Sequence, residues 1–354
     1  MTVRVYRSTD ASAPTLNGTV GSLLTVLDAV LVNGYGAKAA AGWTIAYTGT
    51  NKRVYTMAAG GTGFSVYIDD AAPGAAAARE ARFCGFEAPT GLGTGSGQWP
   101  TSGQSSVGIG MLVIRKSTTA DSTARAWTIV ADGHTFYLFI ETGDKTQPIM
   151  AFATMFGDFF SYSSSDQYNC ALIGRPFENT GEGGAGNMGP TFNLYEPFSQ
   201  VNLVSGACLA STIMGHYLAR NYNGVGSSIN FGKHSDQFKK TQNGGIGMNM
   251  GRNGGWSTGG NADTPSSFPY PAPPNSGMFL SPVWVHHNGF VRGYLKGLWD
   301  ACHFLPMNHN DTFSGTGNMS GKSLLCQQTL GIYMANNYAP GQAQVVIETS
   351  DTWS

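Results

Sequence analysis

The chain has 354 residues and a formal net charge of −1, from 20 Lys and Arg against 21 Asp and Glu. Only 12% of its residues are charged, half of the roughly 25% that is usual, and 49 are glycine. This composition excludes a disordered chain, a collagen-like repeat and a long coiled coil. It also argues against nucleic-acid binding through phosphate contacts, which needs an excess of positive charge. We therefore predict a mainly β (α+β) fold of antiparallel, sandwich-like modules with one short N-terminal helix and long Gly-rich loops.

The first predicted elements are a short strand over residues 3–7 and the clearest helix of the chain, over residues 22–32. Apolar residues recur in this helix at spacings of three and four, which defines one buried stripe. We expect Ser22 to cap its first turn and Asn33-Gly34 to end it through a left-handed residue. Asp28 lies within the apolar segment, and we expect it to bond neighbouring backbone or to face solvent. A helix this short needs a sheet to pack on.

Alternating or continuous apolar segments predict the strands that follow. Thr48–Asn51 and Asp132-Gly133 supply hairpin turns, because such residues adopt the backbone angles of tight turns. The Gly/Ser/Thr-rich stretch over residues 91–106 is interpreted as a flexible boundary or exposed loop. The predicted strands cover residues 43–47, 52–57, 64–68, 81–86, 111–115, 127–131, 135–140, 150–160, 168–173, 279–286, 290–294 and 341–349.

Composition shifts divide the chain into three predicted domains. Residues 1–98 form an α+β domain, residues 107–180 a β-rich middle domain and residues 190–354 a β-rich C-terminal domain. The last two could also form one domain. The C-terminal domain contains a Gly/Pro-rich loop over residues 241–277, and loops this long are usually functional or ordered by contact with another molecule. Because so few charges keep neighbouring copies apart, we expect a homo-oligomer in a symmetric assembly.

Cysteine usage and the N-terminal sequence indicate the compartment. The cysteines are odd in number, scattered and without a CxxC pair, at Cys84, Cys170, Cys208, Cys302 and Cys326. This pattern is typical of free, mostly buried thiols in a chain made in a reducing compartment, and pairing formed later stays open. Residues 1–7 contain no apolar h-region, so we expect no signal peptide. The apolar run over residues 23–32 is too short to span a bilayer, so we expect no membrane insertion.

Two glycine-rich stretches resemble nucleotide-binding motifs without matching them. Gly321-Lys322-Ser323 could end a phosphate-binding loop, but such a loop needs a glycine five residues before Gly321, where Thr316 stands. The alternating glycines over residues 91–97 do not fit the GxGxxG spacing of a dinucleotide site. We interpret the first stretch as a turn, and we predict no cofactor.

Metal ligation and hydrolysis each depend on a weak set of residues. His286-His287, Cys302-His303 and His309 carry groups that suit zinc, but adjacent residues on a strand face opposite sides of the sheet. A glycosidase needs two carboxylates about 5–10 Å apart, and a serine hydrolase needs a nucleophile elbow that this chain lacks. We predict no metal site and no enzyme activity; the carboxylates considered for hydrolysis are Asp132, Glu141, Asp144 and Asp158.

Aromatic residues in Gly-, Pro- and Ser-rich context are the strongest candidates for binding. Aromatic anchors on loops commonly hold a protein partner, because they bury a large area at low entropic cost. Stacking of a host-surface glycan and local burial within the chain are the alternatives. The candidate partner-contact residues are Trp99, Trp256, Phe268, Tyr270 and Trp353.

Several segments spread over most of the chain together carry a resemblance to a known group of proteins. They are residues 2–11, 31–36, 41–43, 49–52, 114–117, 127–140, 157–159, 282–285, 292–299 and 346–350. This pattern resembles a family of virion-associated structural proteins of tailed bacteriophages. The resemblance implies a component of the virus particle and supplies no active-site residues.

Composition and resemblance together predict a structural component of a tailed-bacteriophage virion, in the tail, baseplate or collar. Its expected partners are other virion proteins and further copies of itself, and it is assembled in the host cytoplasm. The alternatives are a host-surface glycan-binding or depolymerising tail protein and a capsid decoration protein.

Overall fold

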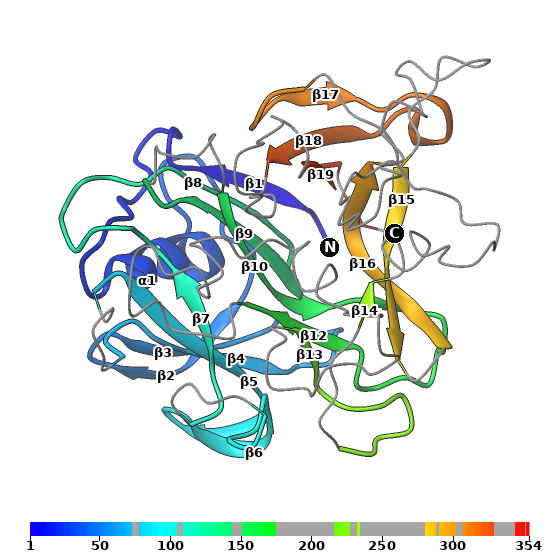
Figure 1. Ribbon diagram of the computed structural model, residues 1–354, viewed down its shortest axis with the longest axis horizontal. Helices are drawn as coiled ribbons and strands as arrows, with labels where there is room; N and C mark the ends of the chain where they lie inside the picture. The colour runs from blue at the N-terminus through cyan, green and yellow to red at the C-terminus, as the bar shows by residue number, and fades with distance from the viewer. Residues whose placement is uncertain are drawn as a thin grey trace, which may run out of the picture.

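The computed structural model describes residues 1–72, 78–104, 109–143, 151–174, 216–226, 232–233, 280–287, 290–301, 307–328, 344–350 and 352–353. Its strands form three sheets, which we call the central, N-terminal and C-terminal sheets. Figure 1 shows the central sheet between the other two. The prediction of a mainly β fold with antiparallel sheets and one short N-terminal helix is therefore confirmed.

The central sheet has six strands in the order β1-β8-β9-β10-β12-β13, all paired antiparallel. They are β1 (Arg4–Arg7), β8 (Trp127–Ala131), β9 (Thr135–Glu141), β10 (Ala151–Asp158), β12 (Cys170–Ile173) and β13 (His216–Leu218). The predicted hairpin turn joins β8 to β9. Asp132 fixes this turn because its Oδ1 accepts the backbone N–H groups of His134 and Thr135, each at 2.8 Å.

The N-terminal sheet has the order β2-β3-β4-β5-β6, with β7 also paired to β5. Its strands are β2 (Thr44–Gly49), β3 (Lys52–Thr56), β4 (Ser65–Asp69), β5 (Glu80–Gly91), β6 (Thr94–Trp99) and β7 (Leu112–Arg115). The expectation of a flexible loop over residues 91–106 is wrong for its first part. The glycines there lie in the β5–β6 hairpin, where Gly93 and Gly97 take positive φ angles of 70° and 63°.

The C-terminal sheet has the order β14-β15-β16-β19-β18-β17, and β11 also pairs with β16. Its strands are β11 (Phe160–Ser161), β14 (Gly232–Lys233), β15 (Leu280–His287), β16 (Phe290–Ala301), β17 (Thr312–Ser314), β18 (Ser323–Gln328) and β19 (Gln344–Glu348). The chain leaves the central sheet after β10 and enters this sheet at β11, so one buried residue, Phe159, separates the two. The glycine-rich stretch before Ser323 is a turn between β17 and β18, as predicted.

The predicted helix is present as α1 (Ser22–Leu27), followed by a π-helical segment over Asp28–Asn33. Gly34 ends it as expected with a positive φ of 76°, but its ψ of 172° differs from that of the predicted left-handed helical residue. The prediction that Ser22 caps the helix is wrong, because its hydroxyl donates to carbonyl oxygens of the preceding turn. Asp70, which directly follows β4, supplies the acceptor instead, since its Oδ2 lies 2.9 Å from the backbone nitrogen of Leu23.

Asp28 faces the N-terminal sheet, contrary to both expectations for it. The Tyr55 hydroxyl donates to Asp28 Oδ1 at 2.6 Å, and Arg53 Nη2 lies 3.1 Å from Oδ2. Both partners lie on β3, so this carboxylate attaches the helical segment to the sheet beneath it.

One large hydrophobic cluster joins α1 to strands of all three sheets. Trp99 at the end of β6 stacks on Phe156 of β10, with ring centres 6.0 Å apart and planes at 21°. The Tyr137 hydroxyl of β9 donates to the Lys296 carbonyl of β16 at 2.8 Å. β1 pairs with β8, and β7 pairs with β5. Strand pairing therefore crosses the boundary predicted between residues 98 and 107.

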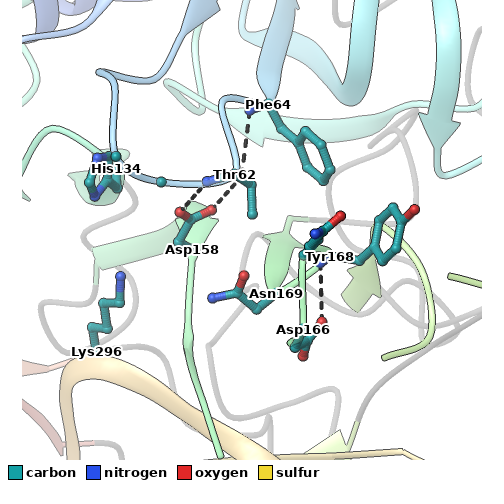
Figure 2. Close-up of a pocket in the computed structure, with 11 residues that line it drawn as sticks. Thr62, Phe64, His134, Asp158, Asp166, Tyr168, Asn169 and Lys296 are labelled. Atoms are coloured by element: carbon teal, nitrogen blue, oxygen red, sulfur yellow. Dashed lines mark hydrogen bonds between the residues drawn. The ribbon is translucent and has the colours of Figure 1, made fainter. Parts of the chain in front are cut away.

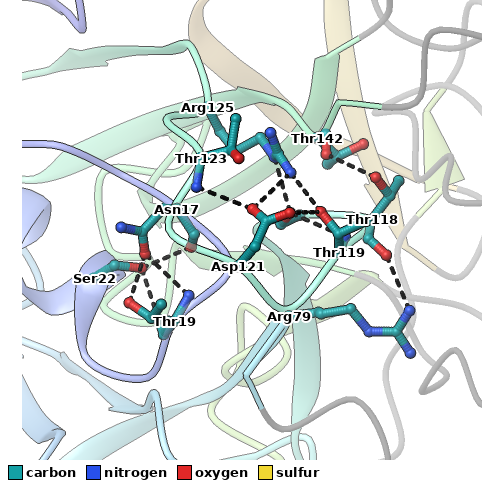
Figure 3. Close-up of polar contacts among 11 residues, drawn as sticks. Asn17, Thr19, Ser22, Arg79, Thr118, Thr119, Asp121, Thr123, Arg125 and Thr142 are labelled. Atoms are coloured by element: carbon teal, nitrogen blue, oxygen red, sulfur yellow. Dashed lines mark hydrogen bonds and ion pairs between the residues drawn. The ribbon is translucent and has the colours of Figure 1, made fainter.

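Polar contacts fix the connection between β7 and β8 (Figure 3). Asp121 accepts the Thr119 hydroxyl at 2.7 Å and the Thr123 backbone N–H at 3.0 Å. Arg125 Nη2 lies 3.3 Å from Asp121 Oδ1, and its Nε donates to Ser117 Oγ at 2.8 Å. This segment leads from the N-terminal sheet back to the central sheet, and these contacts give the connection itself one conformation.

Candidate functional site

A pocket of about 530 Å³ is lined by residues from all three sheets (Figure 2). Gly60 to Thr62 come from the β3–β4 connection, His134 from the β8–β9 turn and Lys296 from β16. Asp158 ends β10, and residues 166–169 precede β12. The size lies within the roughly 300–1,000 Å³ of small-ligand sites.

Asp158 is buried at the back of this pocket, with 2% of its surface exposed. Its Oδ1 accepts the Thr62 hydroxyl at 2.6 Å, and its Oδ2 accepts the Thr62 backbone N–H at 2.9 Å. Burial raises the pKa of Asp158, while the hydrogen bonds from Thr62 and the Lys296 charge act in the opposite direction. Figure 2 shows the Lys296 ammonium pointing toward this carboxylate. The Gly61 backbone lies so close to Asp158 that a Cβ at this position would overlap the carboxylate.

Asp166 lies on the other side of the pocket in a tight ion pair with Arg292. Arg292 Nε and Nη2 donate to its two carboxylate oxygens at 2.7 and 2.6 Å. The Ser161 hydroxyl and the Tyr168 N–H donate to the same carboxylate at 2.8 and 3.1 Å. Burial raises the pKa of Asp166, but the hydrogen bonds and charge of Arg292 outweigh it and leave the pKa below its ordinary value.

A second ion pair contacts Tyr168, one of the residues that line the pocket. Arg220, after β13, makes a two-point contact with Glu87 of β5, in which Nη2 lies 2.8 Å from Oε2. Its guanidinium also lies over the Tyr168 ring, 5.2 Å from the ring centre. The Arg220 carbonyl accepts a hydrogen bond from Arg292 at 2.6 Å. These contacts join the N-terminal, central and C-terminal sheets around the pocket, which makes its walls rigid.

The two pocket carboxylates differ from the other polar lining groups in their partners. Both oxygens of Asp158 and of Asp166 already accept hydrogen bonds from protein donors. The more accessible polar groups are the exposed amide of Gln167 and the half-buried side chains of His134 and Lys296. These groups can donate or accept hydrogen bonds from a polar ligand.

The C-terminal sheet and the segment after β11 carry a group of partly exposed rings, which we call the aromatic cluster (Phe160, Tyr162, Trp284 and Tyr294). Phe160 stacks on Tyr294 with ring centres 4.7 Å apart and planes at 23°. Tyr162 meets Phe160 edge-on at 5.5 Å, and Trp284 meets Tyr294 edge-on at 6.2 Å. Phe160 is 37% exposed and Tyr162 is 55% exposed, which is unusual for rings that also pack on one another.

The candidate partner-contact residues have different outcomes. The exposure expected of Trp99 is wrong: it is 2% exposed and pairs in register with Gly85, whose missing side chain leaves room for the indole. Trp353 is half-buried, meets Tyr137 edge-on at 5.5 Å and donates its indole N–H to Glu348 O at 2.7 Å. Its contact with a partner stays a prediction. Trp256, Phe268 and Tyr270 lie outside the described residues.

In the described part of the chain, the residues considered for metal binding and hydrolysis form no common site, although two of them contact each other. Glu141 pairs with His309 at 3.2 Å, a contact that lowers the pKa of Glu141, and Asp132 holds its own turn. Of the three described carboxylates considered for hydrolysis, Asp158 lines the pocket, while Asp144, Cys302 and His303 lie outside the described residues. Within the described ranges, no three His, Cys, Asp or Glu side chains are placed to hold a metal ion.

Sequence reasoning missed the aromatic cluster, although it identified the correct kind of side chain. Phe160 and Tyr162 alternate along the chain, and Trp284 was assigned to a strand without a role. Their contact depends on the pairing of β11 with β16, which joins residues far apart in the sequence. The only local signal is alternating aromatics in a strand without intervening apolar residues.

Comparisons with known proteins find no family model and no curated protein that matches this chain. None of the helical segments in the described part of the chain has the length and apolarity needed to cross a bilayer.

Proposed function

We propose that this chain is a structural component of a tailed-bacteriophage virion and acts by protein–protein assembly. Its place is in the tail, baseplate or collar, where symmetric copies contact one another and other virion proteins. The proposal starts from the resemblance described above. It is supported by a physical property of the fold, which is that part of its small number of charges is buried.

Three ion pairs of the described residues are almost completely buried. They join Arg115 to Glu80, Lys116 to Asp70 and Arg292 to Asp166, with side-chain exposures of 0 to 4%. A chain with only 12% charged residues therefore places part of that charge inside. The exterior has correspondingly less charge to keep copies apart, which favours association. This internal use of charge is the observation that carries the proposal.

The same ion pairs make the subunit rigid. Arg115–Glu80 lies between β7 and β5, Lys116–Asp70 reaches the start of α1, and Arg292–Asp166 joins β16 to the segment before β12. A building block that repeats in a symmetric assembly needs one well-defined shape, because errors in shape accumulate around a closed ring. The pocket carboxylates are held by internal donors, and the proposed role includes no catalysis.

Mass spectrometry of purified particles of the phage that encodes this chain tests the proposal. We expect the chain in a fixed ratio to other virion proteins after high-salt washing, and immunogold labelling at one site in the particle. The isolated chain should sediment as a discrete homo-oligomer. A chain present in the infected-cell lysate but absent from washed particles would show that it is not a virion component.

A further inference from the structure

The aromatic cluster and the pocket adjoin each other because two chain segments run through both. Asp158 lines the pocket, and Phe160 lies two residues further along the chain. Lys296 lines the pocket, and Tyr294 lies two residues earlier. Two residues of extended chain span about 7 Å, which is less than the width of two aromatic rings side by side. Phe160 pairs with Tyr294 in register, so the two segments that supply Asp158 and Lys296 to the pocket also supply a stacked pair of rings two residues away.

The aromatic cluster is already ordered before any ligand arrives. Each of its rings contacts at least one other, in stacked or edge-on geometries typical of favourable aromatic pairs. The backbone beneath is paired as well, because the Tyr162 N–H donates to the Arg292 carbonyl at 2.9 Å. A ligand that lies on these rings would therefore lose little free energy in ordering them.

The chemistry of the surface changes over a short distance. The rings expose faces with partial negative charge, which attract the polarised C–H groups of a sugar ring. The pocket beside them offers an amide from Gln167, the His134 imidazole and the Lys296 ammonium, which suit hydroxyl groups. A pyranose has this same division, with C–H groups on its faces and hydroxyl groups at its edges.

A flat protein partner fits this surface less well. Stable protein interfaces bury about 1,200–2,000 Å² and have an apolar centre surrounded by polar groups. Besides Phe160 and Tyr162, Val291 is the one large exposed apolar side chain found on the described part of β15 and β16. Three exposed apolar side chains are few for the centre of an interface of that size, whereas a sugar ring needs the face of only one aromatic ring.

We propose that the aromatic cluster and the adjoining pocket bind a saccharide, with pyranose rings lying on Phe160 and Tyr162 and hydroxyl groups entering the pocket. The ligand class is a segment of a cell-surface polysaccharide. This inference goes beyond assembly, because a virion subunit can occupy its place in the particle with or without this site. Asp158 and Asp166 shape the pocket from behind and keep their internal hydrogen bonds when the sugar is bound.

The test is binding of the purified full chain to a microarray of bacterial surface polysaccharides and their oligosaccharides, followed by calorimetric titration of the best soluble oligosaccharide. Tyr162→Ala should weaken binding roughly two- to tenfold, the range expected for one aromatic contact. Tyr162→Leu should weaken it as much, because leucine keeps apolar area but has no ring face. Gln167→Ala should weaken binding from the pocket side.

Tyr47→Ala is the control, because it removes an exposed tyrosine ring at a distant place. Tyr47 is 36% exposed, against 55% for Tyr162, and lies on β2 of the N-terminal sheet. Figure 1 places β2 on the opposite side of the molecule from β15 and β16. This variant should bind the oligosaccharide like the unchanged chain, and all variants should keep the same unfolding temperature within a few degrees.

The outcomes separate the possible occupants of the surface. Selective binding that both Tyr162 variants weaken, with Tyr47→Ala unaffected, supports the saccharide site. No binding to any polysaccharide overturns it, and so does a Tyr162→Leu variant that binds as tightly as the unchanged chain. A change in sedimentation of the Tyr162 variants, without saccharide binding, would assign the rings to contact between copies. None of these results depends on whether the chain is found in particles, so assembly and sugar binding can fail separately.

Discussion

The buried pair of Lys116 and Asp70 gives the sharpest test of how this fold is stabilised. Both side chains are 0% exposed and in direct contact. Lys116 Nζ also donates to Thr19 O at 2.7 Å, while Asp70 Oδ2 accepts the Leu23 N–H at the start of α1. In Lys116→Met, the carboxylate stays buried next to the helix without its counter-charge. Loss of one partner from a buried ion pair costs about 3–5 kcal/mol, and we expect that reduction in the free energy of unfolding.

The pH dependence of this cost follows from the carboxylate. Burial raises the pKa of Asp70 to about 6, against the lowering effect of Lys116. A folded pKa above the unfolded value means that protonation favours the folded state, so the Asp70 contribution to stability improves as pH falls through 6 toward 4. Removal of the ammonium raises this pKa further. The cost of Lys116→Met should therefore be larger at pH 8 than at pH 5.

Urea unfolding followed by circular dichroism at both pH values measures the effect. The double variant Lys116→Met with Asp70→Asn is the control, because a neutral pair removes the buried charge and should recover part of the loss. The reasoning would be refuted by a cost below about 1 kcal/mol at pH 8, the level of an exposed ion pair. It would also be refuted by equal costs at the two pH values.

Three further predictions concern single sites. Gly297→Ala should lower the free energy of unfolding by about 1–3 kcal/mol and change tryptophan fluorescence, because Gly297 has a φ of 65° and a Cβ there would overlap the Trp353 indole. Normal stability of this variant would show that the C-terminal contact is dispensable. Asp166→Asn should flatten the acid limb of the stability profile, since a pKa held below 3.8 contributes stability that is lost as pH falls through it; an unchanged acid limb contradicts this. Cys84 and Cys170 should resist alkylation in the native chain at pH 8 and react after unfolding, because burial raises the pKa of both thiols. Peptide mass spectrometry measures this, and rapid native labelling of either would refute it.

Local patterns predicted the local elements of this fold well. The helix from Ser22, its glycine stop and the hairpin at Asp132-Gly133 follow from spacing and turn residues that act over a few positions. The glycine-rich hairpin of β5 and β6 was misread, because alternating glycines leave no side chains to reveal a strand. There the pairing with the neighbouring strand, and not the residues themselves, determines the structure.

The candidate site was less predictable, because its contacts join distant segments. Thr62 and Asp158 are 96 positions apart, and Asp166 and Arg292 are 126 positions apart. No periodicity links such residues. The burial of Trp99 also depends on another segment. Its glycine-rich neighbourhood suggests exposure, but the missing side chain of Gly85 makes room to bury the indole.

The pairing of β1 with β8 has a consequence for how the chain is made. Trp127 N donates to Ser8 Oγ across 119 positions, so β1 can pair only after the residues of β8 have been synthesised. Until then, β1 presents an unpaired strand edge, which can pair with the same strand of another nascent chain. Production should therefore benefit from slow translation and low temperature, and chains interrupted before β8 should collect in inclusion bodies.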